Sequence, residues 1–343
     1  LHITYRILIR SIDILEKHGY LKKKKGEFDR DKASGKQSRM WATTKLITTL
    51  EFHKITKKMV ERKKSEPIIL RDSDKNELDF KVTRKIQTMR ANVNKLNKFL
   101  AEQDITFEPT LEVLKDIAMS RRSQYPNTNS NQLSRIFNKS FNEGGRFYRH
   151  WCQGPSSEHR KFIRINGQAV TELDYESIHP YLLYAQEGLP MPDEDMYTVE
   201  GNLPDQRAIC KKILLTIFNV TPNQDPVKAV MHDVNKEMKK EEKDRKFKTV
   251  ITKSLIEPLI EKLKSKHTPI AKHFASGIGI QLQGIDSEIS ERILLRLMAQ
   301  GIPCLPVHDS YIVAKDQEDA LRQAMIEEAE AVTGQTPRVD KKY

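Results

Sequence analysis

Two aspartates in the second half of the sequence follow short apolar segments that predict β-strands. Asp174 comes after the segment AVTEL, and Asp309 lies between IPCLPV and SYIVA. If these strands are neighbours in one antiparallel sheet, both carboxylates project from the same edge. Carboxylate oxygens are ligands for Mg²⁺, which keeps waters and substrate phosphates in its other positions. The pair predicts a site for two Mg²⁺ ions, or for Mn²⁺ in their place, although either aspartate alone is more typical of a turn.

A predicted helix between the two aspartates carries two cations on one face. In the segment DQRAICKKILLTIFN, Arg207 and Lys211 are four residues apart, which places them side by side on a helix. Beside metal-binding carboxylates, two such cations can neutralise the charge that develops on the leaving phosphates of a triphosphate. On its own, the pair is better explained as a solvent-exposed basic face.

Composition narrows the class of protein. The 343 residues predict two or three domains, and 59 Lys and Arg against 47 Asp and Glu give a net charge of +12. A surplus of this size favours a polyanionic partner, either nucleic acid or a membrane surface. No apolar run approaches the roughly 18 residues of a membrane span, and no signal peptide or Gly-rich phosphate loop is visible. Three distant cysteines, with no CxxC, argue against disulfides and a cysteine zinc site, so we expect a cytoplasmic protein. We also expect a bacterial or phage context.

Residues 1–64 are predicted to form a small basic domain. An amphipathic helix ends at Gly19, a short strand and a lysine-rich hairpin follow, and β-branched residues from Trp41 to Leu50 predict another strand. Residues 20–64 hold 15 basic and 5 acidic side chains. The pattern resembles the back half of a winged helix, which predicts DNA binding. A solvated basic face or a protein-docking domain is the alternative.

The remaining chain predicts a helical part followed by a mixed α+β part. Residues 65–143 are expected to be mainly helical, with five apolar residues at helical spacing in residues 81–103. From residue 144 onward, residues 163–175 predict a strand, a turn at Asn166-Gly167 and a second strand. Helices are predicted at residues 198–220, 225–277, 285–300 and 321–332.

Three of these segments, taken in order, resemble motifs A, B and C of family A DNA polymerases and single-subunit phage RNA polymerases. The segments are LDYESIHPYLL, RAICKKILLTIFN and PVHDSYIV. Two further stretches, GGRFY with RKFIRINGQAVTELDY and QLQGIDSEISERILLRLMAQG, are similar to the approach to motif A and to the helix before motif C. The resemblance covers roughly residues 144–335. It implies an α+β right-hand polymerase: an antiparallel palm sheet, helical fingers at about residues 198–280, and a thumb-like region at residues 65–143.

The resemblance also implies roles for individual residues in the reaction. Asp174, Asp309 and the backbone carbonyl of Tyr175 would be ligands of the catalytic metal ions. Arg207 and Lys211 would bind the incoming triphosphate, and Lys211 would donate a proton to the leaving pyrophosphate.

Three more residues would contact nucleic acid. His308 and Gln283 would contact the primer end or the minor groove, and Arg146 would contact the template or primer backbone. Asp286 is expected to cap the helix that follows it, although its closeness to Gln283 in the sequence would also let it face the site. The partners implied are a DNA primer-template and nucleoside triphosphates, with an accessory or single-strand-binding subunit left open and no membrane.

Three positions depart from the family A pattern and leave the choice of sugar open. His179, followed by Pro180, replaces a glutamate that blocks a ribose 2′-hydroxyl, and resembles the aromatic residue that does so in family B. We expect His179 to disfavour ribose weakly. Asn219 replaces a tyrosine, and Ser310 replaces the glutamate after the motif C aspartate as in phage RNA polymerases. The last two changes favour an RNA polymerase.

The spacing between the motifs predicts a small enzyme. Lys211 lies 37 residues after Asp174, and Asp309 lies 98 residues after Lys211, so the fingers are short. No acidic exonuclease pattern precedes residue 144. The leading hypothesis is a compact family A-type DNA polymerase without proofreading, such as a primase or a repair or mobile-element enzyme. A small RNA polymerase or RNA primase is the first alternative, and a catalytically inert DNA-binding initiator or regulator is the second.

Overall fold

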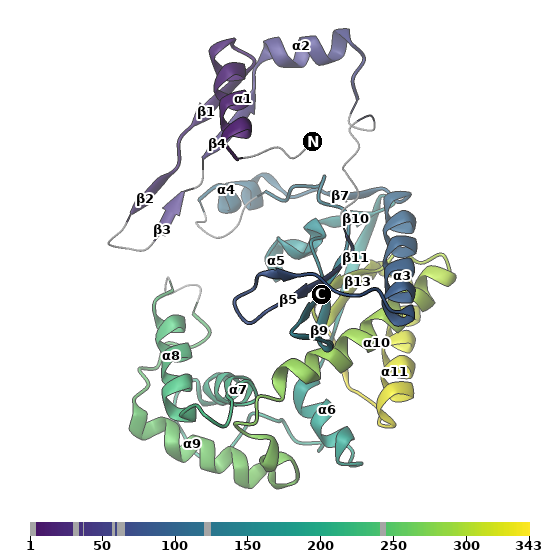
Figure 1. Cartoon of the computed structure of the whole chain (residues 1–343). Helices are drawn as coiled ribbons and strands as arrows, with labels where there is room; N and C mark the ends of the chain where they lie inside the picture. The colour runs from purple at the N-terminus through teal and green to yellow at the C-terminus, as the bar shows by residue number, and fades with distance from the viewer. Residues whose placement is uncertain are drawn as a thin grey trace. The chain divides into compact units, whose positions relative to one another are not determined.

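The chain divides into two compact units in a computed structural model, Leu1–Ser65 and Glu66–Tyr343 (Figure 1). The residues that the structure describes are 5–29, 34–36, 38–56, 59, 66–119, 125–240 and 245–343. The sequence predicts three parts rather than two. The second predicted boundary, between residues 143 and 144, falls inside a strand. The division of the larger unit into thumb, palm and fingers stays a prediction.

The first unit consists of short helices and hairpin strands. Helix α1 ends before Gly19, whose φ of +74° only glycine adopts at little cost. Strand β1 pairs antiparallel with β4, and β2 pairs antiparallel with β3. The elements are α1 (Tyr5–Lys17), β1 (Leu21–Lys24), β2 (Glu27–Asp29), β3 (Ser34–Lys36), β4 (Arg39–Ala42) and α2 (Thr44–Phe52). This order follows the prediction up to β4, while residues 30–33 and 37 of the predicted basic hairpin lie outside the described residues. The resemblance to a winged helix stays a prediction.

The predicted strand from Trp41 to Leu50 is wrong beyond Ala42. Helix α2 starts at Thr44, because the side chain of Thr43 accepts a hydrogen bond from the Leu46 N–H at 3.4 Å and caps the first turn. β-branched residues lower helix propensity only slightly, so a good N-cap can decide the outcome. None of the described side chains between residues 7 and 59 is buried.

The region from residue 66 to 143 contains strands as well as helices, so the prediction of mainly helix is wrong there. Helix α3 (Arg84–Ala101) is as predicted, and its five spaced apolar residues are all buried. Two of the missed strands, β5 (Ile68–Arg71) and β8 (Ser134–Asn138), are short and almost fully buried, and such runs do not reveal whether they are helical or extended. The other strands here are β6 (Glu77–Leu78), β7 (Ile105–Phe107) and β9 (Ser140–Tyr148), with α4 (Leu111–Met119) between β7 and β8. Four of them form a sheet in the order β6-β5-β8-β9, in which β5 and β8 are parallel.

A six-stranded antiparallel sheet lies at the centre of the second unit. Its order is β12-β13-β11-β10-β7, and β14 also pairs with β11. The turn between β10 and β11 is the predicted one: Asn166 and Gly167 have φ values of +51° and +78°, the left-handed pair that suits a tight hairpin. The strands not yet given are β10 (Ile163–Ile165), β11 (Gln168–Tyr175), β12 (Leu305–Val307), β13 (Ser310–Ala314) and β14 (Val339–Lys341).

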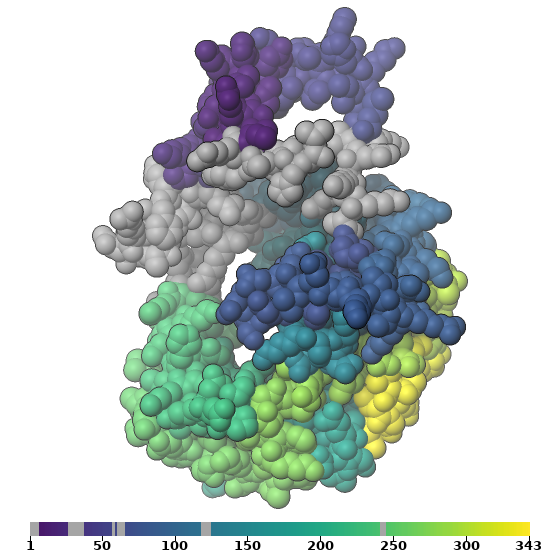
Figure 2. Space-filling view, in the orientation of Figure 1, coloured from purple at the N-terminus to yellow at the C-terminus, as the bar shows by residue number. Residues whose placement is uncertain are grey.

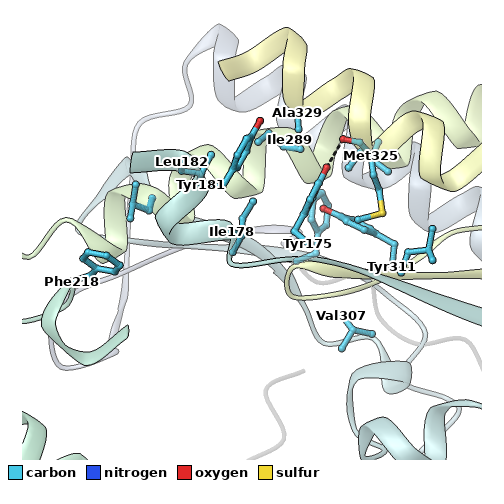
Figure 3. Close-up of a cluster of buried hydrophobic side chains, with 14 of the residues drawn as sticks. Tyr175, Ile178, Tyr181, Leu182, Phe218, Ile289, Val307, Tyr311, Met325 and Ala329 are labelled. Atoms are coloured by element: carbon cyan, nitrogen blue, oxygen red, sulfur yellow. Dashed lines mark hydrogen bonds between the residues drawn. The ribbon is translucent and has the colours of Figure 1, made fainter. Parts of the chain in front are cut away.

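Helices cover this sheet and bury its apolar side chains. Tyr175 and Tyr311, from the neighbouring strands β11 and β13, pack together, and the Tyr175 hydroxyl donates a hydrogen bond to the Met325 carbonyl of α11 at 2.6 Å (Figure 3). The helices that pack here are α6 (Ile178–Gln186), α10 (Gly279–Ala299) and α11 (Glu318–Thr333). The predicted helix at 285–300 therefore begins six residues earlier. Because Tyr175 is anchored at its hydroxyl, the backbone at the end of β11 is held in place.

The residues that follow α6 in the chain form a lobe, seen in green in the space-filling view of Figure 2, and its elements are helices. It contains α7 (Gln206–Ile217), α8 (Pro226–Met238), α9 (Lys253–Lys266) and the 3₁₀ helix η4 (Thr268–His273). Helix α7 begins eight residues later than predicted, and the predicted helix at 225–277 is divided between α8, α9 and η4. Shorter helices elsewhere are η2 (Trp151–Gln153), α5 (Ser157–Arg160) and η5 (Lys315–Gln317). Among the described helices, none combines the length and the apolar composition that a membrane span requires.

We predict that Gly284→Ala destabilises the second unit by about 2 kcal/mol or more. Helix α10 approaches β9 so closely that a Cβ on Gly284 would lie 2.3 Å from the Asn142 carbonyl oxygen. Gly301→Ala is the control, since its Cβ would meet no atom and only its φ of +75° is unfavourable, which costs about 1 kcal/mol. Urea unfolding of both variants measures the difference, and an equal loss would contradict close backbone packing of α10.

Candidate active site

The two predicted aspartates lie at the same edge of the central sheet. Asp174 is opposite Ser310 in the pairing of β11 with β13, and Asp309 lies in the turn just before Ser310. The Tyr175 N–H donates a hydrogen bond to the Asp309 carbonyl at 3.4 Å, which ties the ends of the strands together. The expected juxtaposition of the two carboxylates is therefore present, with the Tyr175 backbone beside them.

The charge of Asp174 is only partly compensated. Burial, and then the negative charge of Asp309, raise the pKa of Asp174 to about 6. The ammonium of Lys342, 3.0 Å from Asp174 Oδ2, opposes this shift. Oδ1 of Asp174 is buried and has no hydrogen-bond partner among the described residues. An additional cation at this edge would therefore be favourable.

A third carboxylate, that of Asp286 in α10, adds to the negative charge around Asp174 and Asp309. Asp286, inside α10 rather than at its N-terminal cap, is fully buried, and its Oδ2 accepts a hydrogen bond from Arg146 Nε of β9 at 2.5 Å. Burial raises the pKa of Asp286 to about 6, with Arg146 opposing and Asp309 reinforcing the shift. Arg146, predicted to contact the nucleic-acid backbone, is instead largely enclosed, with 13% of its side chain exposed. The pairing of Asp286 with Arg146 was not predicted, because the two residues are far apart in the sequence.

His179 lies in the same buried group. It is 8% exposed, and neither ring nitrogen has a hydrogen-bond partner among the described residues. Burial, helped by the positive charge of Arg146 and opposed by Asp309, lowers the pKa of His179 to about 4. The imidazole is therefore neutral at pH 7. His308 behaves differently: it is exposed in the β12–β13 turn at a φ of +61°, with its ring 5.8 Å from that of Tyr148.

Arg207 and Lys211 lie over one aromatic ring, that of Tyr197. The Arg207 guanidinium carbon is 5.5 Å and the Lys211 Nζ 5.2 Å from its centroid. Tyr197 is buried. Burial raises the pKa of its hydroxyl, a hydrogen bond with the Ser177 side chain opposes this shift, and the charge of Asp309 adds to it. Tyr197, which was not predicted to be part of the site, thus holds the two cations of α7 together on one aromatic face. Arg207 is also paired with Asp195, 2.5 Å from Nη2 to Oδ2.

A cavity of about 700 Å³ runs along α7 and α8. The predicted residues Arg207 and Lys211, on α7, and Asn219, two residues after its end, line it. Lys246 lines it as well; burial and neighbouring lysines lower its pKa, with Glu237 opposing. Other charged or titratable lining residues are Lys212, His232 and Asp233. The excess of cations suits an anionic ligand such as a triphosphate.

Asn219, two residues after the end of α7, packs against the start of α10, and Gln283 lies near the start of α10 itself. The Asn219 amide packs so closely against Gly279 that a Cβ there would lie 2.3 Å from its Oδ1, and its Nδ2 donates a hydrogen bond to the Leu215 carbonyl at 2.8 Å. Gln283 is partly exposed and precedes Asp286 by three residues on α10, so the two share a helix face. Their predicted contacts with nucleotide and primer stay predictions.

The acidic edge fits divalent metal ions of the predicted kind. In residues 66–119, 125–240 and 245–343, as in the described parts of the first unit, no group of three or more His, Cys, Asp or Glu side chains is placed to hold a metal. Mg²⁺, however, is commonly held by one or two carboxylates together with substrate phosphates. Asp174, with its unpaired Oδ1, and the partly exposed Asp309 provide such a set.

Comparison with known proteins finds similarity in structure but not in sequence. No model of a protein family matches the sequence, and no curated protein matches it. Among solved structures, the chain is similar to the POL domain of Pol1 from M. smegmatis in complex with a DNA primer-template and dNTP. The TM-score is 0.37 and the identity 10%, over 75% of this chain and 51% of that one, so this chain spans about half its length. The similarity is weak, and the assignment of function depends on the arrangement of the chain's own residues.

We predict that Asp174→Asn stabilises the metal-free protein at pH 8 by about 1–3 kcal/mol, since each pKa unit corresponds to 1.36 kcal/mol. The folded-state pKa of Asp174 is raised from 3.8 to about 6, so stability falls as pH rises from about 4 to 6, where only the folded state binds the proton. Thermal unfolding in EDTA at pH 8 and pH 4 measures this, and the difference should shrink at pH 4. A less stable variant at pH 8 would show that the Lys342 ion pair outweighs burial and repulsion.

Proposed function

We propose that the chain is a template-directed nucleotidyltransferase, most specifically a compact DNA polymerase of the family A type without proofreading. The observation that carries the proposal is the pairing of β11 with β13, which brings Asp174 and Asp309 to one sheet edge. Arg207 and Lys211 lie together over the ring of Tyr197, whose pKa is raised by burial and, more weakly, by the charges of Asp195 and Asp309. Acidic metal ligands next to triphosphate-binding cations are what phosphoryl transfer requires.

In the proposed reaction a primer 3′-oxygen attacks the α-phosphorus of the nucleotide. A bond forms between the 3′-oxygen and the α-phosphorus while the bond from the α-phosphorus to the oxygen bridging to the β-phosphate breaks. The proton of the 3′-hydroxyl passes to water, and Lys211 donates a proton to the leaving pyrophosphate. Arg207 exchanges its partner Asp195 for phosphate oxygens, and Lys246 adds charge from the far side of the cavity. Divalent ions held by Asp174, Asp309 and the Tyr175 carbonyl would supply the charge that activates the hydroxyl and stabilises the pyrophosphate.

The nucleic acid would be bound through several features. The basic first unit is proposed to bind duplex DNA through its phosphates, with an affinity that falls steeply with salt. His308 and Gln283 are proposed to contact the primer end or the minor groove. Arg146 is fixed by Asp286, so we propose that it acts at the nucleic-acid backbone through its remaining donors.

We predict that Asp309→Asn lowers primer extension about 100-fold or more with Mg²⁺, because a ligand charge is lost where transition-state charge develops. DNA binding should be unchanged. Asp319→Asn is the matched control, since Asp319 is exposed beyond the opposite end of β13. The assay uses a DNA template with and without a primer, and dNTPs and rNTPs in separate reactions.

The same assay separates the proposal from its alternatives. Extension that requires primer and dNTPs supports a DNA polymerase. Products without primer, or only with rNTPs, support a primase or a small RNA polymerase, which the asparagine at position 219 and the serine at position 310 favour. Unimpaired extension by Asp309→Asn, or no product together with DNA binding, would overturn the catalytic assignment and favour a DNA-binding initiator.

We predict that His179→Ala raises incorporation of rNTPs relative to dNTPs by about 10-fold. The neutral, buried imidazole is proposed to pack against the sugar and disfavour a 2′-hydroxyl, and pocket contacts of this kind are worth about 1–3 kcal/mol. His179→Phe keeps a ring without nitrogens and should retain the discrimination. The measurement is the ratio of kcat/KM values for the two nucleotides, and an unchanged ratio in the alanine variant would remove this role.

A further inference from the structure

A lysine from a distant part of the chain forms an ion pair with the proposed metal ligand Asp174. The Nζ atom of Lys342 is 3.0 Å from Asp174 Oδ2 and 3.3 Å from Glu172 Oε1. Strand β14, which precedes Lys342, pairs with the end of β11 in a register that places Asp340 opposite Asp174. The pairing of these two strands therefore brings the cation to the acidic edge.

The main chain of Lys342 is fixed, while its side chain is partly open to solvent. Its N–H donates a hydrogen bond to the Glu172 carbonyl at 2.9 Å. About a third of the side chain, 32%, is exposed. The ammonium can therefore leave Asp174 by rotation of its flexible stem, without unpairing β14.

Asp174, rather than Glu172, depends on Lys342 for a compensating positive charge. Glu172 already has a bidentate partner in Arg160, with N–O distances of 2.8 and 2.7 Å, and also accepts a hydrogen bond from Ser310 at 2.7 Å. For Asp174, Lys342 is the cation within ion-pair distance among the described residues. A metal ion bound through both carboxylate oxygens of Asp174, or through Oδ2 alone, would therefore have to share Oδ2 with Lys342 or take it over.

We propose that Lys342 is a tethered cation that competes with divalent metal ions for Asp174 and thereby sets the metal affinity of the site. The inference rests on the proposed role of Asp174 as a metal ligand. Metal binding would displace the ammonium from Oδ2 toward Glu172 or solvent. Before metal arrives, Lys342 compensates a carboxylate that burial and Asp309 make costly to ionise.

The test measures Mn²⁺ binding to the full chain without nucleotide or DNA, by the electron paramagnetic resonance signal of free Mn²⁺. Lys342→Met removes the charge and keeps most of the stem, and we expect Mn²⁺ to bind about 5- to 10-fold more tightly, the scale of a partly buried ion pair. Lys342→Arg keeps the charge and should stay within about twofold of the wild type. Asp174→Asn should abolish the competed site.

Lys341→Met is the matched control. It removes one positive charge from the adjacent residue, which pairs with Glu318 at 2.6 Å instead of with Asp174. We expect a change of less than about twofold, which separates local competition from the general electrostatic field. Thermal unfolding in EDTA checks that all variants are folded.

Each other outcome overturns the inference. Unchanged or weaker Mn²⁺ binding by Lys342→Met would show that the lysine does not compete, and equal gains in the two methionine variants would show only a long-range effect. Absence of Mn²⁺ binding in every variant would show that there is no metal to compete with.

Primer extension separates this inference from the proposed function: tighter Mn²⁺ binding by Lys342→Met in a chain that never extends primers would support the inference and reject polymerase activity. Asp309-dependent extension with unchanged Mn²⁺ affinity would do the reverse.

Discussion

The antiparallel pairing of β11 with β13 is the constraint on which the proposed site depends. It sets Asp174 opposite Ser310 and next to Asp309, and a slip by one residue would turn Asp174 to the other face of the sheet. The same pairing concentrates negative charge, because Glu172 lies two residues before Asp174 on the same face and Asp286 lies behind them. The surrounding elements must therefore supply cations, and they do so with Arg146 of β9, Arg160 of α5 and Lys342 beyond β14.

These cations differ in how firmly they are held. Arg160 and Arg146 are almost enclosed and make close contacts with buried carboxylates, so they serve to make the fold tolerate those charges. Lys342 is more exposed and is shared between two carboxylates. With Arg160 and Arg146, the chain compensates the buried carboxylates Glu172 and Asp286. The two carboxylates at the sheet edge, those of Asp174 and Asp309, have less positive charge around them. Such a deficit costs stability and is what a site for divalent metal ions needs.

Local patterns predicted the elements that carry the site better than their surroundings. The turn at Asn166-Gly167, the strands around Asp309 and the buried face of α3 follow from positive-φ residues and apolar spacing, which act over a few residues. The strands between residues 66 and 143 did not, because a short buried run such as β5 has no period that separates strand from helix. Helix α2 formed where a strand was predicted because one side chain, Thr43, caps it.

The sequence by itself determined the types and order of the residues proposed to act in the reaction: Asp174, then Arg207 and Lys211, then Asp309, each in a local setting that predicts its element. Only the tertiary structure decided their electrostatic partners. Asp286 pairs with Arg146, and Asp174 with Lys342, although the partners come from distant parts of the chain. No local period links residues so far apart, since strand pairing and helix packing bring them together. That is why the carboxylates could be predicted while the cations that compensate them could not.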